Sequence, residues 1–432
     1  MTSDAGETLE SDRARPFLLR VESTQVWVQT VGRLLYQTGY GAIQFFIPLV
    51  FVNQVGLSAT AVGFAIGCGA LAGMAGHFLG GYLADSPDYG RKRALIFSAI
   101  LSLLAAGLLI VTKALPLLIF VNLIMGISAG CYWTAADASV VDVTPSDQRQ
   151  RAFGVLVLAD SIGLGLGIWG GRRLLAQPQP LFFAGSVILL LFLIFIGIAA
   201  AETRSENTPE AETDTLKGFA IAIKDPSLQL FILANVLFTT YIGLVGSTLP
   251  LYFTRSTGTS AADVSNQFTL WYIGFGALIQ LPLVQALSRL RQVSVLMISM
   301  GLWIAGFMLV WAVGPLTTGP VGTAIALALL SLAGAAYKPF APALVAELAP
   351  ESFRGIYLAI SYQCWSLGYF IGPVLGGWAL DQPGAIAQRF WLGTAVTTLA
   401  GVFILYQLGQ SEDRAIEAQL ERTPNLEPQD SL

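Results

Sequence analysis

The chain has 432 residues, of which 54% are hydrophobic and only 12% are charged. An average soluble domain carries roughly a quarter charged residues, so this composition excludes an ordinary soluble protein. The net charge of −4 excludes a nucleic-acid binder, which would present a dense basic surface. We therefore expect a membrane protein that has the lipid bilayer as a partner and does not bind nucleic acid.

Cysteine and histidine are too few to build a metal centre. Cys68, Cys131 and Cys364 all lie in apolar runs, which is typical of packing residues and not of disulfides or metal ligands. His77 is the only histidine of the sequence and is either a satisfied packing residue or a proton carrier. The sequence predicts no metal and no cofactor.

Membrane-spanning helices are predicted from stretches without Asp, Glu, Lys or Arg, because about 20 mostly apolar residues cross the ~30 Å hydrocarbon core. The stretches 34–84 and 292–337 are each long enough for two spans. One span each is predicted within 94–112, 114–136, 152–171, 174–201, 226–254, 264–288, 355–380 and 390–411. The expected fold class is an all-α membrane protein with twelve transmembrane helices.

The loops predict which side of the membrane the termini occupy. Residues 1–25 contain five acidic residues and no apolar core, so they do not form a cleavable signal. An even number of spans leaves both termini on one side, where the tails and loops carry 16 Lys and Arg residues against 5 on the other side. The positive-inside rule therefore predicts two cytoplasmic termini. We expect a multi-pass protein of the plasma membrane, specifically a bacterial inner membrane.

The longest polar interruption, residues 202–225, divides the chain into two halves of six spans each. The resulting domain prediction has five parts. These are a cytoplasmic tail at 1–25, a six-helix bundle at 26–201, a cytoplasmic linker at 202–225, a second six-helix bundle at 226–410 and a cytoplasmic tail at 411–432.

An internal repeat relates the two halves. An acid–proline–arginine pattern recurs at an offset of 205 residues, as Asp142, Pro145 and Arg149 and then as Glu347, Pro350 and Arg354. Tyr132 and Tyr337 keep this offset, and Gly170-Gly171 recurs as Gly376-Gly377 at an offset of 206. Coincidence is the alternative, but spacing, charge sign and position all agree. The repeat predicts two pseudo-symmetric bundles, which are typical of secondary transporters with a substrate site between the halves.

The loop between the second and third spans carries a recognisable motif. It reads Gly81-Tyr82-Leu83-Ala84-Asp85 and continues, after four residues, with Gly90-Arg91-Lys92-Arg93. This resembles the G-x-L-A-D-x-x-G-R-K signature loop of the major facilitator superfamily, with two additional residues before the second glycine. The resemblance covers nearly the whole chain and implies the major facilitator fold. It also implies a gating motif formed by Gly81, Asp85, Gly90, Arg91, Lys92, Arg149 and Arg354.

In that family the loop carboxylate bonds to helix ends of the other half and closes one side of the transporter. The resemblance implies this role for Asp85, with the eleventh span as its partner. The alternative is that the basic cluster only sets the topology.

The eleventh span carries a second motif, with helix-packing residues Gly368, Gly372, Pro373, Gly376 and Gly377. It is similar to the G-x3-G-P-x-x-G-G motif that the drug:proton antiporter branch carries in its fifth span. Here the fifth span has several glycines but lacks the proline.

Polar side chains of the first span share one face. At 100° per residue they fall within one 100° arc, which comprises Arg33, Tyr36, Gln37, Tyr40 and Gln44. Spans one, four, seven and ten line the cavity in the family, so the resemblance implies a substrate-facing surface. A polar seam between helices is the alternative.

Charged residues inside the spans are expensive and persist when they are paired or functional. Asp160 lies nine residues beyond Arg151, and Lys338 lies nine residues before Glu347, about 13 Å along a helix and near the bilayer centre. Three alternatives stay open: Arg33 snorkels to the surface, Asp137 forms a gate pair, and Asp160 faces either Lys338 or Arg33. The substrate or coupling candidates are Arg33, Tyr36, Tyr40, Gln44, Trp133, Asp137, Asp160, Tyr337 and Lys338.

These features favour a secondary active transporter that moves a small-molecule substrate by alternating access. The aromatic candidates and the antiporter-like motif favour proton-coupled efflux of amphipathic organic compounds. Uptake or exchange of a small organic anion on Lys338 is the alternative. A membrane-embedded enzyme is disfavoured because the sequence has one histidine and neither an H-E-x-x-H nor a D-D-x-x-D motif, and a sensor would carry long cytoplasmic domains. We expect a monomer that uses protons as coupling ion and is not an enzyme.

Overall fold

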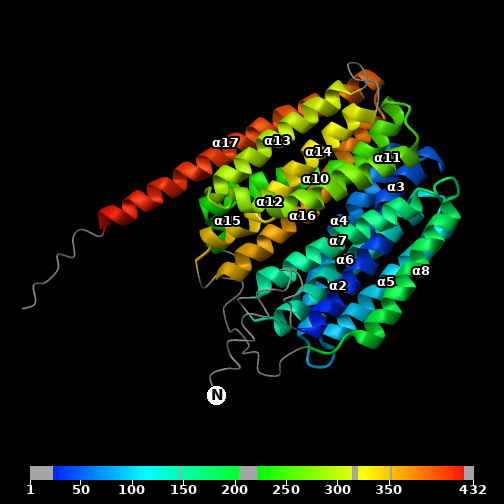
Figure 1. Ribbon diagram of the computed structural model, residues 1–432, viewed down its shortest axis with the longest axis horizontal. Helices are drawn as coiled ribbons and strands as arrows, with labels where there is room; N and C mark the ends of the chain where they lie inside the picture. The colour runs from blue at the N-terminus through cyan, green and yellow to red at the C-terminus, as the bar shows by residue number, and fades with distance from the viewer. Residues whose placement is uncertain (1–22, 146–147, 204–220, 314–319, 351–352, 423–432) are drawn as a thin grey trace, which may run out of the picture. The chain divides into compact units, whose positions relative to one another are not determined.

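A computed structural model of the chain describes residues 23–145, 148–203, 221–313, 320–350 and 353–422, and the elements within these ranges are helices (Figure 1). Residues 1–22 of the predicted N-terminal tail, 204–220 of the predicted linker and 423–432 of the C-terminal tail lie outside the described residues. In the first half the elements are α2 (Thr24–Tyr36), η2 (Gln37–Gly41), α3 (Ala42–Asn53), α4 (Ala59–Asp85), α5 (Gly90–Val111), α6 (Leu115–Val143), α7 (Arg149–Gly171) and α8 (Pro178–Ala199). In the second half they are α10 (Pro226–Ser256), α11 (Ala261–Gln267), η3 (Phe268–Gly274), α12 (Phe275–Leu287), α13 (Gln292–Ala312), α14 (Pro320–Tyr337), α15 (Phe340–Leu348), α16 (Arg354–Leu380) and α17 (Gly384–Arg422).

Eleven helical segments of the described chain are long and apolar enough to cross a membrane. Three of them combine consecutive elements, namely Thr24–Asn53, Ala261–Leu287 and Pro320–Leu348. The 27-residue helix α16 has a comparable length, about 40 Å at 1.5 Å per residue. The all-α membrane fold that the sequence predicts is therefore confirmed.

The contacts divide the chain into two compact units. The first unit comprises Met1–Pro209 together with Ser260–Gly274, and the second comprises Glu210–Thr259 together with Phe275–Leu432. The eighth span is thus divided at Gly274, where the π-helix η3 ends. Its first part, α11 and η3, packs against α7, whereas α12 packs against α14.

Within the first unit, glycines let α4 and α6 approach until their backbones touch. A Cβ atom at Gly126 would lie 1.8 Å from the carbonyl oxygen of Gly69, and one at Gly76 would lie 2.4 Å from that of Ile127. Small residues are enriched at such membrane interfaces, because apolar side chains gain little by leaving lipid and close packing must hold the helices together.

A ridge of glycines spaced four residues apart is repeated in the two units. Gly163, Gly167 and Gly171 of α7 face the first span, and Gly368, Gly372 and Gly376 of α16 face α10. A Cβ at Gly163 would lie 2.4 Å from the Leu34 oxygen, and one at Gly368 would lie 2.2 Å from Thr239 Oγ1. The glycines of each pair are 205 positions apart, and so are Leu34 and Thr239, which the first pair meets.

This ridge corrects the glycine register that the sequence suggests. The pairing of Gly170-Gly171 with Gly376-Gly377 at an offset of 206 is wrong by one residue. Gly171 corresponds to Gly376, while a Cβ at Gly170 would meet no atom within 4 Å. Adjacent helical residues point in directions about 100° apart, so only one glycine of each pair can face the partner helix.

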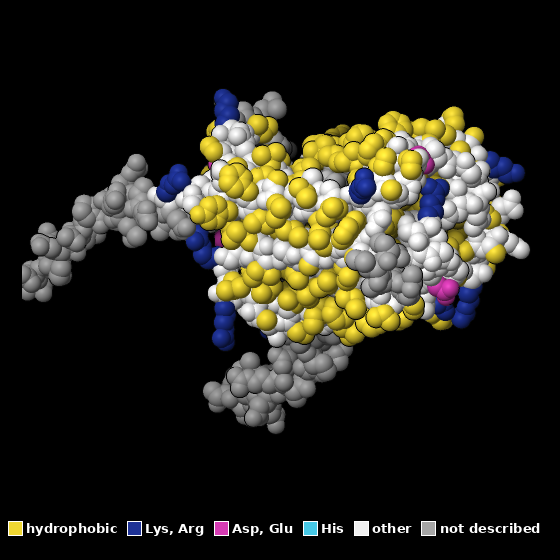
Figure 2. Space-filling model, turned by 90° about the horizontal axis from the view of Figure 1, so that it is seen from above, with side chains coloured by type: hydrophobic (Ala, Val, Ile, Leu, Met, Phe, Trp, Pro, Cys, Tyr) yellow, Lys and Arg dark blue, Asp and Glu magenta, His cyan; other side chains and the backbone are white. Residues whose placement is uncertain are grey.

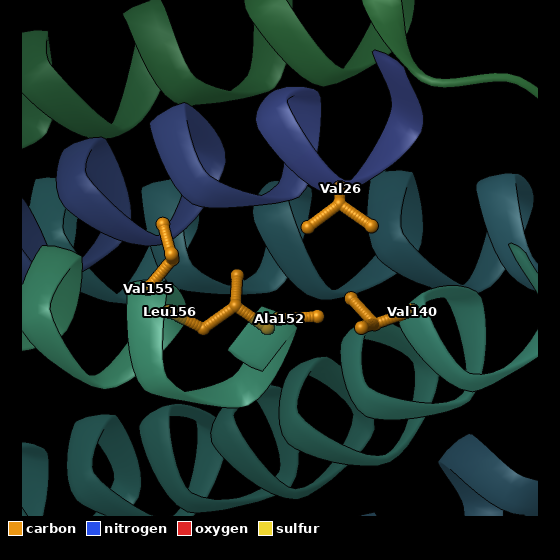
Figure 3. Close-up of a cluster of buried hydrophobic side chains, with 5 residues drawn as sticks. All are labelled: Val26, Val140, Ala152, Val155 and Leu156. Carbon is orange, nitrogen blue, oxygen red and sulfur yellow. The ribbon is translucent and has the colours of Figure 1, made fainter. Parts of the chain in front are cut away.

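A small apolar cluster joins the ends of three helices of the first unit (Figure 3). Val26 of α2 and Val140 of α6 point toward Ala152, Val155 and Leu156 of α7, and all five side chains are buried. The cluster fixes how these three helices meet, one or two turns from a charged residue on each of them.

Hydrophobic side chains cover much of the face in Figure 2, with most Lys and Arg side chains near its borders. Large exposed side chains such as Phe78, Leu278 and Val396 belong to membrane-spanning helices. In water such a surface would be an aggregation liability, whereas in a bilayer it faces lipid.

Candidate functional site

A three-residue charge cluster lies inside the first unit. Arg33 Nη1 donates to Asp160 Oδ2 at 3.0 Å, and Arg33 Nη2 donates to Asp137 Oδ1. The Arg33 side chain is 4% exposed, against 17% for Asp160 and 40% for Asp137. One guanidinium thus joins two carboxylates from α6 and α7, and the cluster carries a formal charge of −1. The low exposure of Arg33 excludes the snorkelling arrangement.

The local sequence explains why these three groups meet. Arg33 lies two helical turns after Val26, Asp137 lies about one turn before Val140, and Asp160 lies about one turn after Leu156. Because the apolar cluster of Figure 3 holds the three helix ends together, the charged residues one or two turns further in are directed into the same space.

The first span changes its helix type directly after Arg33. Residues Gln37–Gly41 form the π-helix η2, whose wider turn contains an additional residue. The ideal rotation of 100° per residue therefore does not hold within this segment. Tyr36 and Tyr40 nevertheless stay on one side, since their rings stack with centroids 4.9 Å apart.

Aromatic rings surround the charge cluster. The buried Tyr36 ring stacks on Tyr132 at 3.8 Å and meets Trp133 edge-on at 6.3 Å. The Arg33 guanidinium carbon lies 4.9 Å from the Trp133 ring centroid, within cation–π range. The structure thus brings together the first-unit candidates, and it adds Tyr132. The sequence offered Tyr132 only as the repeat partner of Tyr337.

Tyr40 and Gln44 extend this region along the first span. Gln44 Nε2 donates to the Tyr40 hydroxyl at 3.2 Å, and the Tyr40 hydroxyl donates to the Met125 carbonyl at 3.1 Å. The candidate His77 lies on α4, with Nδ1 3.1 Å from Thr134 Oγ1 of α6.

The second unit places its candidates in different surroundings. The buried Tyr337 hydroxyl donates to Asn235 Oδ1 at 2.5 Å, and its ring stacks on Phe238 at 4.5 Å. Asn235 Nδ2 donates in turn to the Ser361 carbonyl at 3.2 Å. Lys338 is exposed at the step between α14 and α15. Asn235 was missed by the sequence reasoning, although an amide inside the apolar run 226–254 was a usable signal.

The signature loop forms a charged cluster around Arg91. Arg91 Nε donates to Asp142 Oδ2 at 3.0 Å, and Nη1 donates to Asp85 Oδ1. Glu202 accepts the backbone N–H groups of Arg91 at 2.8 Å and Lys92 at 3.1 Å, so it caps the N-terminus of α5. Asp85 is paired within its own unit here, and its bond to the eleventh span stays a prediction.

Glycine is required at position 90 for two reasons. Its φ of +77° lies in the left-handed region, and a Cβ would lie 2.3 Å from Glu202 Oε2. Glu202 was missed by the sequence reasoning, although it is the first acid after the sixth span.

The repeated acids have equivalent roles in the two units. Asp142 holds Arg91 at the start of α5, and Glu347 Oε1 accepts from Gln292 Nε2 at the start of α13 at 3.3 Å. Arg149 donates to the Thr144 carbonyl at 3.3 Å, and Arg354 is the first residue of α16. Each acid thus ties the end of one candidate membrane span to the start of another.

Comparison with known proteins identifies the class that these features define. The sequence profile of the Major Facilitator Superfamily matches residues 30–244 and 231–428. A "Na(+), Li(+), K(+)/H(+) antiporter" of Planococcus maritimus is 23% identical over 389 residues, which cover 80% of this chain and 87% of that protein. The "Multidrug resistance protein MdtH" of Photorhabdus laumondii is 24% identical over 392 residues, with coverages of 90% and 94%.

Solved structures share the fold. The nucleoside transporter NupG superimposes with a TM-score of 0.75 at 14% identity, covering 89% of this chain and 99% of its own. A D-xylose-proton symporter gives a TM-score of 0.71 at 18% identity, with coverages of 88% and 96%.

The repeated helical bundles and the buried charges define a multi-pass membrane transporter of the secondary active class. The chain belongs to the major facilitator superfamily. It is accordingly a transporter of small molecules and not an enzyme.

Proposed function

We propose that this transporter exports amphipathic organic compounds in exchange for protons. The observation that carries this proposal is the buried Arg33 guanidinium, which bridges Asp137 and Asp160. It lies beside an aromatic wall, by which we mean the rings of Tyr36, Tyr40, Tyr132 and Trp133. The names of the relatives support the proposal, because one is a multidrug resistance protein and another a cation/proton antiporter. In this proposal the protein acts as a monomer in a bacterial inner membrane, with both termini cytoplasmic.

Protons act on the charge cluster in the proposed mechanism. A proton taken up by Asp160 cancels its charge, removes the attraction to Arg33 Nη1 and leaves Arg33 held by Asp137 alone. The formal charge of the cluster then changes from −1 to 0. Because the three residues come from α2, α6 and α7, their pairing couples proton binding to the packing of three helices.

The aromatic wall supplies the substrate surface. Flat rings bind apolar and aromatic groups with few fixed hydrogen bonds, which suits amphipathic compounds better than sugars. Tyr40 and Trp133 are only partly buried and so are the rings that a substrate can reach.

Transport into proteoliposomes with an imposed pH gradient tests the proposal, with cationic, neutral and anionic compounds compared side by side. Wild-type protein should accumulate amphipathic compounds only when a gradient is present. Asp160→Asn should abolish the gradient dependence while substrate binding stays detectable, and Asp263→Asn, in an exposed helix cap, is the matched control. Gradient-driven transport that survives in both Asp160→Asn and Asp137→Asn would eliminate the carboxylates from the mechanism.

Uptake or exchange of an organic anion is the second candidate. It is favoured by the exposed position of Lys338 at the step between α14 and α15, where an ammonium can receive an anionic group. In this case Lys338→Ala should stop transport of anions while neutral compounds still move. Full activity of Lys338→Ala toward every class of compound would remove this candidate.

A further inference from the structure

The second unit contains a cavity of about 480 Å³ that none of the proposed transport steps uses. Its walls come from the ends of α10, α16 and α17 and from Val313, which follows α13. Arg255 on this wall lies 29 residues after Pro226, about 43 Å along α10 from the end that follows the linker. The cavity is therefore at the opposite membrane boundary, and its volume is within the range of small-molecule sites.

Among the described residues that line this cavity, Arg255 is the one with a charged side chain. Its Nη1 donates to the Leu380 carbonyl at 3.0 Å, which fixes the guanidinium at the end of α16. A guanidinium has five N–H donors, so this bond leaves donors for a ligand. None of the ion pairs among the described residues includes Arg255. The cavity is thus lined by a fixed positive charge.

The remaining polar lining consists of uncharged groups that can donate hydrogen bonds. Tyr252 and Ser256 lie about one turn apart on α10, and Gln382 and Gln388 flank the start of α17. The two amides are held by helix carbonyls, Gln382 by Trp378 at 3.3 Å and Gln388 by Trp311 at 2.9 Å. A guanidinium fork surrounded by neutral donors matches an anionic group with several acceptor oxygens, such as a phosphate diester or monoester.

The surroundings indicate where such a phosphate comes from. Trp378, half a turn before Leu380, is 50% exposed, and Ile386 at the start of α17 is 43% exposed. Tryptophan is enriched at the level of lipid headgroups, where its ring is apolar and its N–H is hydrated. Both side chains are next but one or next in sequence to lining residues, Leu380 and Ala387, so the cavity lies at the level where phospholipid phosphates are concentrated.

We propose that the Arg255 cavity binds a phosphate group, supplied by a phospholipid headgroup or by a soluble phosphate ester. Arg255 binds the anionic oxygens, and the hydroxyl and amide groups bind the remaining acceptors. The site would be independent of the transport mechanism, since it shares no residue with the Arg33 cluster.

Thermal unfolding of the purified full chain in detergent tests the proposal. The probes are phosphatidylglycerol, a galactolipid with the same acyl chains but no phosphate, sn-glycerol 3-phosphate and inorganic phosphate. A phosphate-bearing probe should raise the Tm of the wild type, and the galactolipid should not. A shift with phosphatidylglycerol alone assigns the phosphate to lipid, and a shift with the soluble probes assigns it to a soluble ester.

Variants separate this site from unspecific binding. Arg255→Gln retains a donor for the Leu380 carbonyl but loses the positive charge, so its Kd for the phosphate-bearing probe should rise at least about tenfold. Arg255→Lys keeps the charge and should still bind that probe. Gly384→Leu should fill the cavity, because a Cβ there meets no atom within 4 Å, and it tests the site even if Arg255→Gln fails to fold. Arg389→Gln, on the same helix end but outside the cavity lining, is the control and should bind like the wild type. The proposal is wrong if no probe shifts the wild type, if the galactolipid acts equally, or if Arg255→Gln and Gly384→Leu respond like the wild type.

Discussion

Arg33 shows how one side chain can organise the polar interior of a membrane bundle. Its guanidinium is bonded by carboxylates on two neighbouring helices and covered by the Trp133 ring, so its charge is compensated without reaching the surface. An isolated charge at the bilayer centre costs roughly 2.5–3.5 kcal/mol on insertion scales. The cluster is therefore stable only as a unit, which is what makes the protonation of one member consequential.

Replacing Arg33 by alanine should lower stability strongly. The change leaves two partly buried carboxylates facing each other, and breaking a buried ion pair in this way typically costs about 3–5 kcal/mol. Tm measured by intrinsic fluorescence should fall, and neutralising both acids with Asp137→Asn and Asp160→Asn in the same chain should restore part of it. Arg414→Ala, which removes only a bond to Gln410 on the surface, is the control. An unchanged Tm in Arg33→Ala would show that the cluster does not stabilise the bundle.

Asp85 should affect transport more than stability. Its side chain is 75% exposed in its pair with Arg91, and exposed ion pairs contribute about 0–1 kcal/mol. Asp85→Asn should therefore keep the wild-type Tm and insert normally, because the positive-inside rule depends on basic residues and Arg91, Lys92 and Arg93 are retained. If Asp85 also closes the gate against the eleventh span, transport should fall about tenfold or more. Asp88→Asn in the same loop is the control, and wild-type transport by Asp85→Asn would contradict the gating role.

At the scale of elements, the glycine ridges decide how the helices pack. The ridges of α7 and α16 meet equivalent positions of the first span and of α10, so the two units use the same backbone contact. The π-helix η2 lies in this contact, where a Cβ at Gly167 would be 2.3 Å from the Thr38 carbonyl oxygen. The duplicated sequence thus corresponds to a duplicated interface.

Alanine substitutions along the ridge should separate packing from helix propensity. Gly167→Ala and Gly372→Ala each place a Cβ less than 3 Å from a backbone oxygen, so the helices must move apart and Tm should fall in both. Gly170→Ala meets nothing within 4 Å and should keep Tm or raise it, since alanine favours a helix over glycine by about 1 kcal/mol. Equal behaviour of Gly167→Ala and Gly170→Ala would show that the contact does not determine packing.

At the scale of the whole molecule, charge distribution determines orientation. The loops on the side of the tails carry 16 basic residues and those on the other side carry 5, a bias that favours cytoplasmic termini. The same bias makes Arg255 unusual, because it is one of the few basic residues on the sparsely charged side. Orientation and the Arg255 cavity can therefore be tested on the same preparation.

Cysteine labelling from outside the cell should report this orientation. In a background without Cys68, Cys131 and Cys364, the exposed Asn53→Cys at the end of α3 should react with an impermeant reagent. Tyr89→Cys, 55% exposed in the signature loop, should react only after the membrane is permeabilised. The reverse pattern would contradict a cytoplasmic N-terminus, and labelling of both residues from the same side would contradict α4 as a membrane span.

The sequence by itself determined the helical membrane fold and the internal repeat, because both depend on composition and spacing along the chain. Apolar stretches of about 20 residues have few alternatives to a membrane helix, and an offset of 205 is visible without knowing any contact. The gathering of Arg33, Tyr36 and Tyr40 on one side of the first span was also predictable from helical periodicity.

Only the tertiary structure decided which side chains meet. Depth along a helix did not decide whether Asp160 pairs with Arg33 or with Lys338. In the structure Asp160 is bonded to Arg33, because the apolar cluster around Val26 fixes how α2 and α7 face each other. The π-helix η2 changes directions that ideal periodicity assigns, and the one-residue glycine register follows from which Cβ would collide. Glu202 caps α5 across 111 residues of sequence, a pairing that no local pattern contains. The direction in which a side chain points around its helix axis, and the distant residue that it meets, depend on how the helices pack. Spacing along one chain does not specify either of them.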